Sequence, residues 1–419
     1  MKRVVITGCG VLLPCGDDAS VVWSDIIKCN SWIKKNQKFD ISNYKSQVCA
    51  GVYLTDELYE KYDFLVQAKD RRHMDDVEYV ALIAAYNAMK DCELLEDSSL
   101  DRTNFGTFIA SGIGGIKTIQ KTAKTLIEGG NRKISPFFLT SSLINMCAGN
   151  IAIKFGLKGT SLSHVSACAS STHAIGEAFF NIRYGRLTGC LAGGSEMAVC
   201  ELGIGGFDAM NALSTSYNDD PSVASRALDK GRDGFVIGEG SVVLMLEELE
   251  HAKKRNAKIY CEVVGYGTSC DAYHITSPDP DGNGASYAMN SAISDANISV
   301  DDIDYINLHG TSTPLGDAAE IKAIKKTFKE RYNNVMISSS KSVSGHLLGA
   351  TGALEAMLCA KSLYEQVLIP SANIKNLDEC CAGMNVVTMS EKSNIKYAMS
   401  NSFGFGGTNG CLIFKKYEG

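Results

Sequence analysis

The chain has 419 residues, of which 45% are hydrophobic and 21% charged, a composition typical of a folded protein and not of a disordered one. Its 47 acidic and 41 basic residues give a formal net charge of −6, so no overall positive field attracts nucleic acid. Fifteen cysteines without a C-x-x-C pair indicate reduced thiols. No targeting segment or bilayer-length apolar run is present, so we expect a cytoplasmic protein without membrane or nucleic-acid partners.

Short β-branched runs alternate with longer helical patterns along the whole chain, which predicts α/β layers. The predicted strands cover residues 3–7, 104–110, 162–166, 189–192, 242–246, 260–267, 305–308, 335–338 and 397–401, and the clearest helices cover 77–90 and 353–364. The polar stretch 247–258 is the nearest thing to a boundary. We therefore expect two similar halves, residues 1–250 and 251–419, fused into one body.

The first predicted strand runs into Gly8-Cys-Gly10, which looks like the start of a dinucleotide-binding fingerprint. The third glycine position holds the bulky Leu13, and no acidic residue follows a second strand at the expected distance. No phosphate-binding Gly-Lys-Ser/Thr occurs either. His309 and His346 are far apart in sequence and lack the acidic neighbours of a metal-binding helix. We expect no cofactor and no metal, and keep a nicotinamide oxidoreductase as an alternative that cofactor titration would detect.

One cysteine stands out by its position. Residues 162–166 predict a short strand, and a turn of small residues around Cys168 leads into an amphipathic helix. Unpaired amide groups at a helix N-terminus favour a thiolate, so the pattern predicts a lowered pKa for Cys168. Ala167, Ala169 and Ser170 leave the sulfur approachable. A buried, inert thiol remains the ordinary interpretation of the other fourteen cysteines.

Two histidines follow predicted strands in loops of small residues. His309 lies after the strand 305–308, and His346 lies in a glycine-rich loop after the strand 335–338. Loops beyond the carboxyl ends of strands are where α/β proteins place chemistry. Lys341 precedes His346 in the same loop. Glu320, on the helix predicted after Pro314, is a candidate partner for the charge of Lys341. Each histidine alone could simply fill a hydrogen bond, so the pair is more informative than either.

Long motifs in a fixed order resemble the β-ketoacyl-(acyl carrier protein) synthases of the thiolase fold, most closely the type II enzymes. They are Met1 to Gly10, Ser111-Gly-Ile-Gly-Gly115, Ile134-Ser-Pro-Phe-Phe138, Ser166-Ala-Cys168-Ala, Ala192-Gly-Gly-Ser-Glu196, Asp229-Lys-Gly-Arg-Asp-Gly-Phe235, Asp271-Ala-Tyr-His-Ile-Thr276, His309-Gly-Thr-Ser-Thr-Pro-Leu-Gly-Asp317, Lys341 to Ala353 and Asn401-Ser-Phe-Gly-Phe-Gly-Gly-Thr-Asn409. The likeness covers nearly the whole chain. It implies an α/β thiolase fold in which two similar βα halves form a layered α-β-α-β-α body.

The resemblance implies a condensing site built on Cys168, His309 and His346. Cys168 would accept an acyl chain from its carrier as a thioester. Malonyl-(acyl carrier protein) would then lose CO₂, and its carbanion would attack that thioester to give a product two carbons longer. Imidazole N–H groups of both histidines would stabilise the enolate that decarboxylation forms. No metal or redox cofactor is implied.

The same resemblance assigns supporting roles. Phe405 would act as a gate between the acyl and malonyl sites, with its backbone N–H and that of Cys168 forming an oxyanion hole. Lys341 would anchor the network with Glu320. The substrate-contacting positions would be Thr276, Thr311, Thr313, Ile113, Phe138 and Phe403. Ile113 and Phe138 match positions that line the acyl pocket at a homodimer interface.

An acidic carrier protein, in acyl and malonyl forms, is the implied partner, and Lys69, Arg71 and Arg72 form a basic cluster that could meet it. Two positions depart from the family pattern. Asn211 stands where relatives often have an arginine for carrier contact, and Ala227-Leu228 replaces a Pro-aromatic pair. A non-catalytic partner subunit of the same fold is the main alternative function, although such subunits lack the nucleophile that Cys168 would provide.

Overall fold

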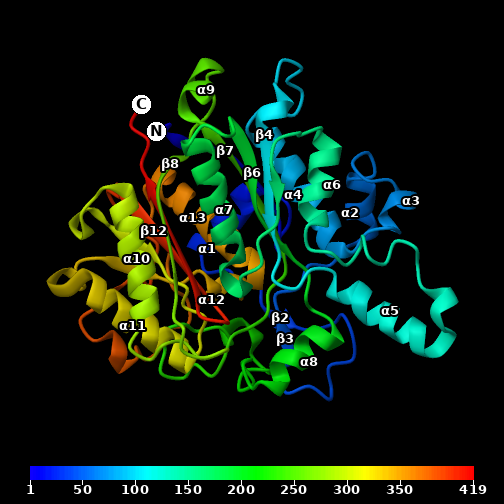
Figure 1. Ribbon diagram of the computed structural model, residues 1–419. Coiled ribbons are helices and arrows are strands. Elements are labelled where there is room, and N and C mark those ends of the chain that lie inside the picture. The colour runs from blue at the N-terminus through cyan, green and yellow to red at the C-terminus, as the bar shows by residue number, and fades with distance from the viewer.

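The structure is a computed structural model that describes residues 1–419, and its largest feature is one mixed sheet of eleven strands (Figure 1). In space the strands follow the order β11-β10-β9-β12-β13-β8-β1-β7-β6-β4-β5. Their bounds are β1 (Val4–Leu12), β4 (Phe105–Ala110), β5 (Ser161–Leu162), β6 (Gly189–Glu196), β7 (Gly240–Glu248), β8 (Cys261–Cys270), β9 (Tyr305–Asn307), β10 (Met336–Ser338), β11 (Asn385–Val386), β12 (Tyr397–Gly404) and β13 (Thr408–Lys415). A separate ribbon pairs β2 (Lys34–Lys35) with β3 (Val48–Cys49).

The pairing pattern repeats in the two halves of the sheet. In the first half, β1 pairs antiparallel with β7, and β7 pairs antiparallel with β6. Beyond them, β6 pairs parallel with β4, and β4 pairs parallel with β5. From β8 outward, the pairs with β13, β12, β9 and β10 have the same order. Strands β1 and β8 pair antiparallel and join the halves. The predicted fold class is therefore confirmed.

Helices form layers outside and between the two halves (Figure 1). Helix α4 packs on β1 and β7, α10 packs on β8 and β13, and α7 and α13 pack against each other in the middle. The longer helices are α1 (Ala19–Ile27), α4 (Asp76–Asp91), α5 (Ile116–Gly129), α6 (Met146–Phe155), α7 (Ser170–Arg183), α8 (Glu201–Ala209), α10 (Asn283–Ala296), α11 (Pro314–Phe328) and α13 (Thr351–Glu365). Short ones are α2 (Asp56–Lys61), α3 (Ala68–Arg71), α9 (Leu249–Lys254) and α12 (Lys341–Ser344). None of these helices combines the length and apolar character of a membrane span.

Helix α13 shows why the middle layer forms. Every residue from Thr351 to Leu363 is buried, including the charged Glu355 and Lys361, so this helix has no face for water. The start of α13 meets α7 so closely that a Cβ on Gly352 would lie 2.1 Å from Thr172 Oγ1. Glycine is therefore required where the two central helices meet.

Most predicted elements are present, and the differences have local causes. The predicted strand 162–166 is reduced to β5, because after Leu162 the chain leaves β4 and the Ser166 N–H bonds the Ser170 hydroxyl at 2.9 Å. Strand β13 was not predicted. Its residues Cys411 to Phe414 are buried on both faces, so they form an apolar run without the alternation that marks a strand.

Candidate active site

A cavity of about 310 Å³ lies where loops from both halves meet. The residues from the sequence prediction that line it are Cys168, Thr276, His309, Thr311, Thr313, Glu320, His346, Phe403 and Phe405. The reactive atoms of Cys168, His309 and His346 all lie within 4.8 Å of one another. Residues that are up to 178 positions apart in sequence are therefore brought into one constellation.

Cys168 is held in a strained turn. It is the central residue of the 3-10 turn Ala167–Ala169, and Ala167 has a φ of +50°, a left-handed conformation that is unfavourable for a residue with a side chain. Helix α7 begins only after this turn, at Ser170. The Ser170 hydroxyl donates to the Ala167 carbonyl at 2.6 Å and accepts from the Ser166 N–H, which fixes the turn.

The prediction of a lowered thiol pKa is wrong for the resting enzyme. Burial raises the pKa of the Cys168 thiol to about 12, while the charge of Lys341 and the backbone N–H groups of Cys168 and Phe405 lower it by less. Removal from water has the larger effect, because the solvation free energy that a thiolate loses on burial exceeds the stabilisation that the nearby charge and dipoles provide. Cys168 is therefore a thiol in the free protein near neutral pH.

The two imidazoles are neutral. Burial first, then the charge of Lys341, keeps the pKa of both His309 and His346 well below the usual histidine range. Their ring centroids are 5.5 Å apart. His346 Nδ1 lies 2.8 Å from the Thr351 hydroxyl, whereas His346 Nε2 and His309 Nδ1 are buried without a protein partner. The site therefore offers ring nitrogens to a substrate without the cost of deprotonating an imidazolium.

Lys341 connects the two histidine loops, but its direct partner was not predicted. Its ammonium group donates to the His309 carbonyl oxygen and to a Glu355 carboxylate oxygen, and all of these groups are buried. The expected pairing with Glu320 is indirect: the two side chains form no ion pair, although the Lys341 charge opposes the rise that burial causes in the Glu320 pKa. Glu320 instead accepts the backbone N–H groups of His309 and Gly310 at 2.9 and 2.8 Å, so it shapes the turn. A glutamate in the middle of the largely apolar run 353–360 was the sequence signal for Glu355.

The turn between β12 and β13 carries Phe405 to the mouth of the Cys168 turn. A Cβ on Gly404 would lie 2.6 Å from the Ser166 carbonyl and 3.2 Å from the Cys168 nitrogen, so only glycine allows this approach. Thr408 Oγ1 donates to the Ser166 carbonyl at 3.1 Å. The backbone N–H groups of Cys168 and Phe405 are thus both close enough to the sulfur to lower the pKa of the thiol.

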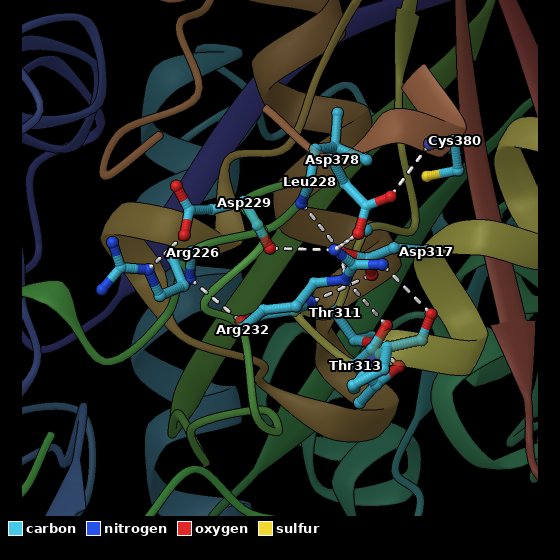
Figure 2. Close-up of polar contacts among 12 residues, drawn as sticks. Arg226, Leu228, Asp229, Arg232, Thr311, Thr313, Asp317, Asp378 and Cys380 are labelled. Atoms are coloured by element: carbon cyan, nitrogen blue, oxygen red, sulfur yellow. Dashed lines mark hydrogen bonds and ion pairs between the residues drawn. The ribbon is translucent and has the colours of Figure 1, made fainter. Parts of the chain in front are cut away.

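The loop of Thr311 and Thr313 is held from below by Arg232 (Figure 2). The guanidinium group donates to the carbonyls of Thr313 and Pro314 at 3.4 and 3.2 Å. It is itself neutralised by two carboxylates, the half-buried Asp378 at 2.6 Å and the buried Asp317 at 3.3 Å. Arg232 was not among the predicted residues. It fixes the two threonine hydroxyls, which lie 3.0 Å apart at the cavity wall.

Ile113 and Phe138 lie outside this cavity, although Ile113 packs near Leu348 behind the His346 loop. The connection is made by Glu196, a buried carboxylate that sequence reasoning did not single out. It accepts the backbone N–H groups of Gly112, Ile113 and Gly349 at 2.7, 3.1 and 2.9 Å. A charged residue ending the glycine-rich run 192–196 was the available signal, because a buried strand rarely ends in an unpaired carboxylate.

The basic cluster is less uniform than predicted. Lys69 and Arg72 are exposed, but the Arg71 guanidinium lies over the Tyr59 ring and pairs with Asp63 at 3.3 Å. Only Lys69 and Arg72 are therefore free of partners in this cluster. Asn211 stands where relatives often have an arginine. Its side-chain oxygen accepts a hydrogen bond from the Lys45 ammonium group at 2.7 Å, so a positive charge is present next to Asn211.

The other departure from the family pattern is the pair Ala227-Leu228, and its backbone conformation accounts for its place in the structure. Leu228 has a φ of +68°, and its N–H donates to Asp317 at 2.9 Å (Figure 2). Ala227 and Leu228 are both fully buried in the core around α10 and α11. The pair therefore belongs to the support beneath the threonine loop and does not form part of the surface.

Comparison with known proteins places the chain. Its residues 1–252 match the family model "Beta-ketoacyl synthase, N-terminal domain", and residues 260–375 match "Beta-ketoacyl synthase, C-terminal domain". It is 44% identical to a 3-oxoacyl-(acyl-carrier-protein) synthase 2 of Coxiella burnetii over 415 residues, 99% of each chain. It is 43% identical to the protein of that name in Staphylococcus aureus over 419 residues, which is 100% of this chain and 99% of the relative.

Solved structures give the same result. A beta-ketoacyl synthase from Burkholderia phymatum superposes with a TM-score of 0.92 at 34% identity, and a ketosynthase solved with its type II polyketide acyl-carrier protein with 0.91 at 31%. Each comparison covers the whole of both chains. The fold and the cysteine-histidine site thus define a condensing enzyme of the thiolase-like class. The chain belongs to the β-ketoacyl synthase family.

Proposed function

We propose that Cys168, His309 and His346 carry out the 3-oxoacyl-(acyl-carrier-protein) synthase 2 reaction of this enzyme. That reaction condenses an acyl-carrier-protein thioester with malonyl-(acyl carrier protein) in fatty acid elongation. The observation that carries the proposal is the arrangement of one thiol and two neutral imidazoles within 4.8 Å in a single cavity. Lys341 holds both histidine loops at this spacing.

The first step is acyl transfer to sulfur. The Cys168 sulfur attacks the acyl thioester carbonyl, and the thiol proton passes to the departing carrier sulfur through the facing imidazole. The resulting oxyanion is held by the backbone N–H groups of Cys168 and Phe405. Because the pKa of the thiol is about 12, the proton leaves during the attack and not before it. The Phe405 turn, with glycines on both sides, opens to admit the second substrate.

The second step joins the substrates. Malonyl-(acyl carrier protein) loses CO₂, and the N–H groups of His309 and His346 stabilise the enolate oxygen that forms. We assign the Thr351 hydroxyl as the donor to His346 Nδ1, 2.8 Å away, which places the ring proton on the unpartnered Nε2. The enolate carbon then attacks the acyl carbonyl, and Cys168 leaves and takes up one proton. Thr276, Thr311, Thr313 and Phe403 guide the malonyl-bearing arm along the cavity wall.

We propose a homodimer as the working unit. Strand β5 is a two-residue sheet edge, and it carries exposed apolar side chains, with Leu162 at 47% exposure and Val165, three residues further on, at 58%. An apolar patch at an open edge strand is the kind of surface that a second copy covers. The acyl chain would then extend past Ile113 toward the dimer interface, where the position of Phe138 is expected to complete the acyl pocket.

For the acyl carrier protein, we propose a basic docking rim. Lys69 and Arg72 are exposed and face an acidic partner without competing carboxylates, whereas Arg71 chiefly stabilises its own helix turn. Lys45 supplies the cation that Asn211 lacks, at the edge of the cavity. Such rim charges act mainly on the association rate and on its salt dependence.

We propose that the two halves divide near residue 250, where β7 ends and the short helix α9 leads to β8. The nucleophile lies in the first half, and both histidines, Lys341 and the Phe405 turn lie in the second. We also retain the cytoplasm as the predicted compartment, because fifteen free cysteines fit a reducing environment.

The test separates the partial reactions. Acyl loading, malonyl decarboxylation and condensation are measured for Cys168→Ala, His309→Ala and His346→Ala. We expect Cys168→Ala to abolish loading and condensation in a folded protein, and both histidine variants to lose decarboxylation more than loading. Undiminished condensation in Cys168→Ala would reject the catalytic proposal in favour of another nucleophile. An inactive wild-type protein would instead support the non-catalytic partner subunit.

A further inference from the structure

The condensing constellation is also a set of metal ligands. Sequence reasoning excluded a metal site because His309 and His346 are distant in the chain, but the structure brings one atom each from Cys168, His309 and His346 within 4.8 Å of one another. His346 is 2% exposed and His309 is 9% exposed, and His346 Nε2 and His309 Nδ1 have no hydrogen-bond partner. Unpartnered nitrogens this deeply buried are free to bind an ion.

The surroundings also fit metal coordination. Thr351 holds His346 Nδ1 at 2.8 Å and leaves Nε2 free, the arrangement by which an outer contact orients a metal-binding imidazole. Glu320 lines the cavity, but its oxygens accept the N–H groups of His309 and Gly310. The centre therefore offers sulfur and nitrogen, which suit Zn²⁺ and its relatives and not Mg²⁺ or Ca²⁺.

The spacing requires only a small adjustment. Tetrahedral Zn²⁺ places sulfur at about 2.3 Å and nitrogen at about 2.0 Å, so neighbouring ligand atoms lie roughly 3.3–3.8 Å apart. Ligand atoms within 4.8 Å reach this spacing when side chains in loops shift by about 1 Å. Three protein ligands leave a fourth position, which opens into the cavity and can hold a water molecule or a substrate oxygen.

We propose that a thiophilic divalent cation of the Zn²⁺ type binds between Cys168, His309 and His346 and blocks the enzyme. On binding, the Cys168 S–H bond breaks, a sulfur–metal bond forms and the proton goes to solvent. The bound ion would be coordinated by the sulfur that must accept the acyl chain. It would also be coordinated by both imidazoles, which must contact the malonyl thioester. The inhibitory consequence rests on the proposed function, whereas the binding site itself rests on geometry.

A second pair of thiols, Cys380 and Cys381, could also bind a thiophilic ion, and replacing it gives a matched control. Cys380 and Cys381 are adjacent, with sulfur atoms 3.7 Å apart. The Cys380 N–H donates to Asp378, the residue that pairs with Arg232 (Figure 2). Any metal held there would also give a thiolate signal. The double variant Cys380→Ser/Cys381→Ser removes it without touching the cavity-lining residues.

The test is a titration of the full-length, chelator-treated enzyme with Co²⁺, which reports its ligands spectroscopically. We expect one equivalent to give a sulfur-to-cobalt charge-transfer band and tetrahedral visible bands. The bands should be lost in Cys168→Ala, changed or lost in His346→Ala, and retained in Cys380→Ser/Cys381→Ser. Prior acylation of Cys168 should prevent them. Absence of the bands in the wild type, or their persistence in Cys168→Ala, would overturn the proposal.

Activity is followed in parallel. One equivalent of Zn²⁺ should lower condensation at least about tenfold, and a chelator should restore it. Bands without inhibition would overturn the inhibitory claim. Failure of the proposed function appears differently, as a metal-free wild-type enzyme that does not condense substrates, while the cobalt spectrum still decides the site.

Discussion

Two turns in this enzyme have nearly the same backbone and perform different tasks. One is the 3-10 turn Ala167–Ala169 before α7, and the other is the 3-10 turn Leu348–Ala350 before α13. Their first residues have φ of +50° and +49°, and their last residues have φ of −90° and −89°. The two turns occupy equivalent places in the repeated halves.

The middle residue decides what each turn does. In the first turn it is Cys168, whose backbone faces the end of β12 at Gly404. In the second it is Gly349, whose N–H donates to Glu196 at the end of β6. A Cβ on Gly349 would lie 2.2 Å from the Gly112 nitrogen. The same turn therefore occurs once in each half. We call the turn at Gly349 the closed turn, because backbone atoms leave no room for a side chain there, and the turn at Cys168 the open turn, because its side chain lines the cavity.

The following residues differ in the same way. Ser170 binds the backbone of its own turn through Ala167, whereas Thr351 reaches across to His346 Nδ1. The first contact is structural and local. The second orients the ring of His346, which we propose to be catalytic, so equivalent positions should respond differently to loss of the hydroxyl.

The largest expected effect tests the closed turn. Gly349→Ala should destabilise the enzyme by about 3 kcal/mol or more, because the new methyl group meets backbone atoms that cannot move aside. Chemical denaturation measures this, with Gly206→Ala as the control. Gly206 lies in α8 with no atom within 4 Å of the added Cβ, and alanine should stabilise there by up to about 1 kcal/mol. Equal stability of the two variants would show that the second turn is not closed.

The next effect tests the state of the open turn. Because the pKa of the Cys168 thiol is about 12, its thiolate fraction rises tenfold with each pH unit below that value. Alkylation of Cys168 by iodoacetamide should therefore accelerate about a hundredfold between pH 7 and pH 9. Mass spectrometry of the Cys168 peptide measures the rate. A plateau below pH 8 would mean that the turn ionises the thiol after all.

A smaller effect tests the orienting hydroxyl. Thr351→Val should lower the rate of malonyl decarboxylation about tenfold, because His346 loses the contact that fixes its ring and tautomer. KM for the acyl substrate should change little, since Cys168 is untouched. Thr351→Ser keeps the hydroxyl and is the control that should restore the rate. Equal rates in the valine and serine variants would remove Thr351 from the catalytic argument.

The smallest effect is at the equivalent serine. Ser170→Ala should reduce the free energy of unfolding by about 1 kcal/mol, because the N–H of Ser166 and the carbonyl of Ala167 lose a hydrogen-bond partner. Condensation per folded molecule should stay close to that of the wild type. A large fall in kcat with unchanged stability would reverse the distinction between the two hydroxyls.

Much of this site could be predicted because its residues lie in locally recognisable positions. Cys168 follows a strand and precedes a helix, and His309 lies at the exit of β9 in a small-residue loop. The supporting charges could not be found in this way. Glu355 sits in an apolar helix and Arg232 in a loop, and each acts through groups on other segments. For the same reason the sequence did not show that the direct ion pair of Lys341 is with Glu355, while its charge reaches Glu320 only at longer range.

The sequence by itself determined the alternation of strands and helices, the membership in a condensing family and the residue types of the reaction, because these depend on local patterns and on the order of motifs. Tertiary structure decided the resting charge of the nucleophile. The same three loops that bring a thiol, two imidazoles and a lysine together also remove water from the sulfur, and the loss of its solvation outweighs the nearby positive charge and amide dipoles. Only the packed environment sets that balance.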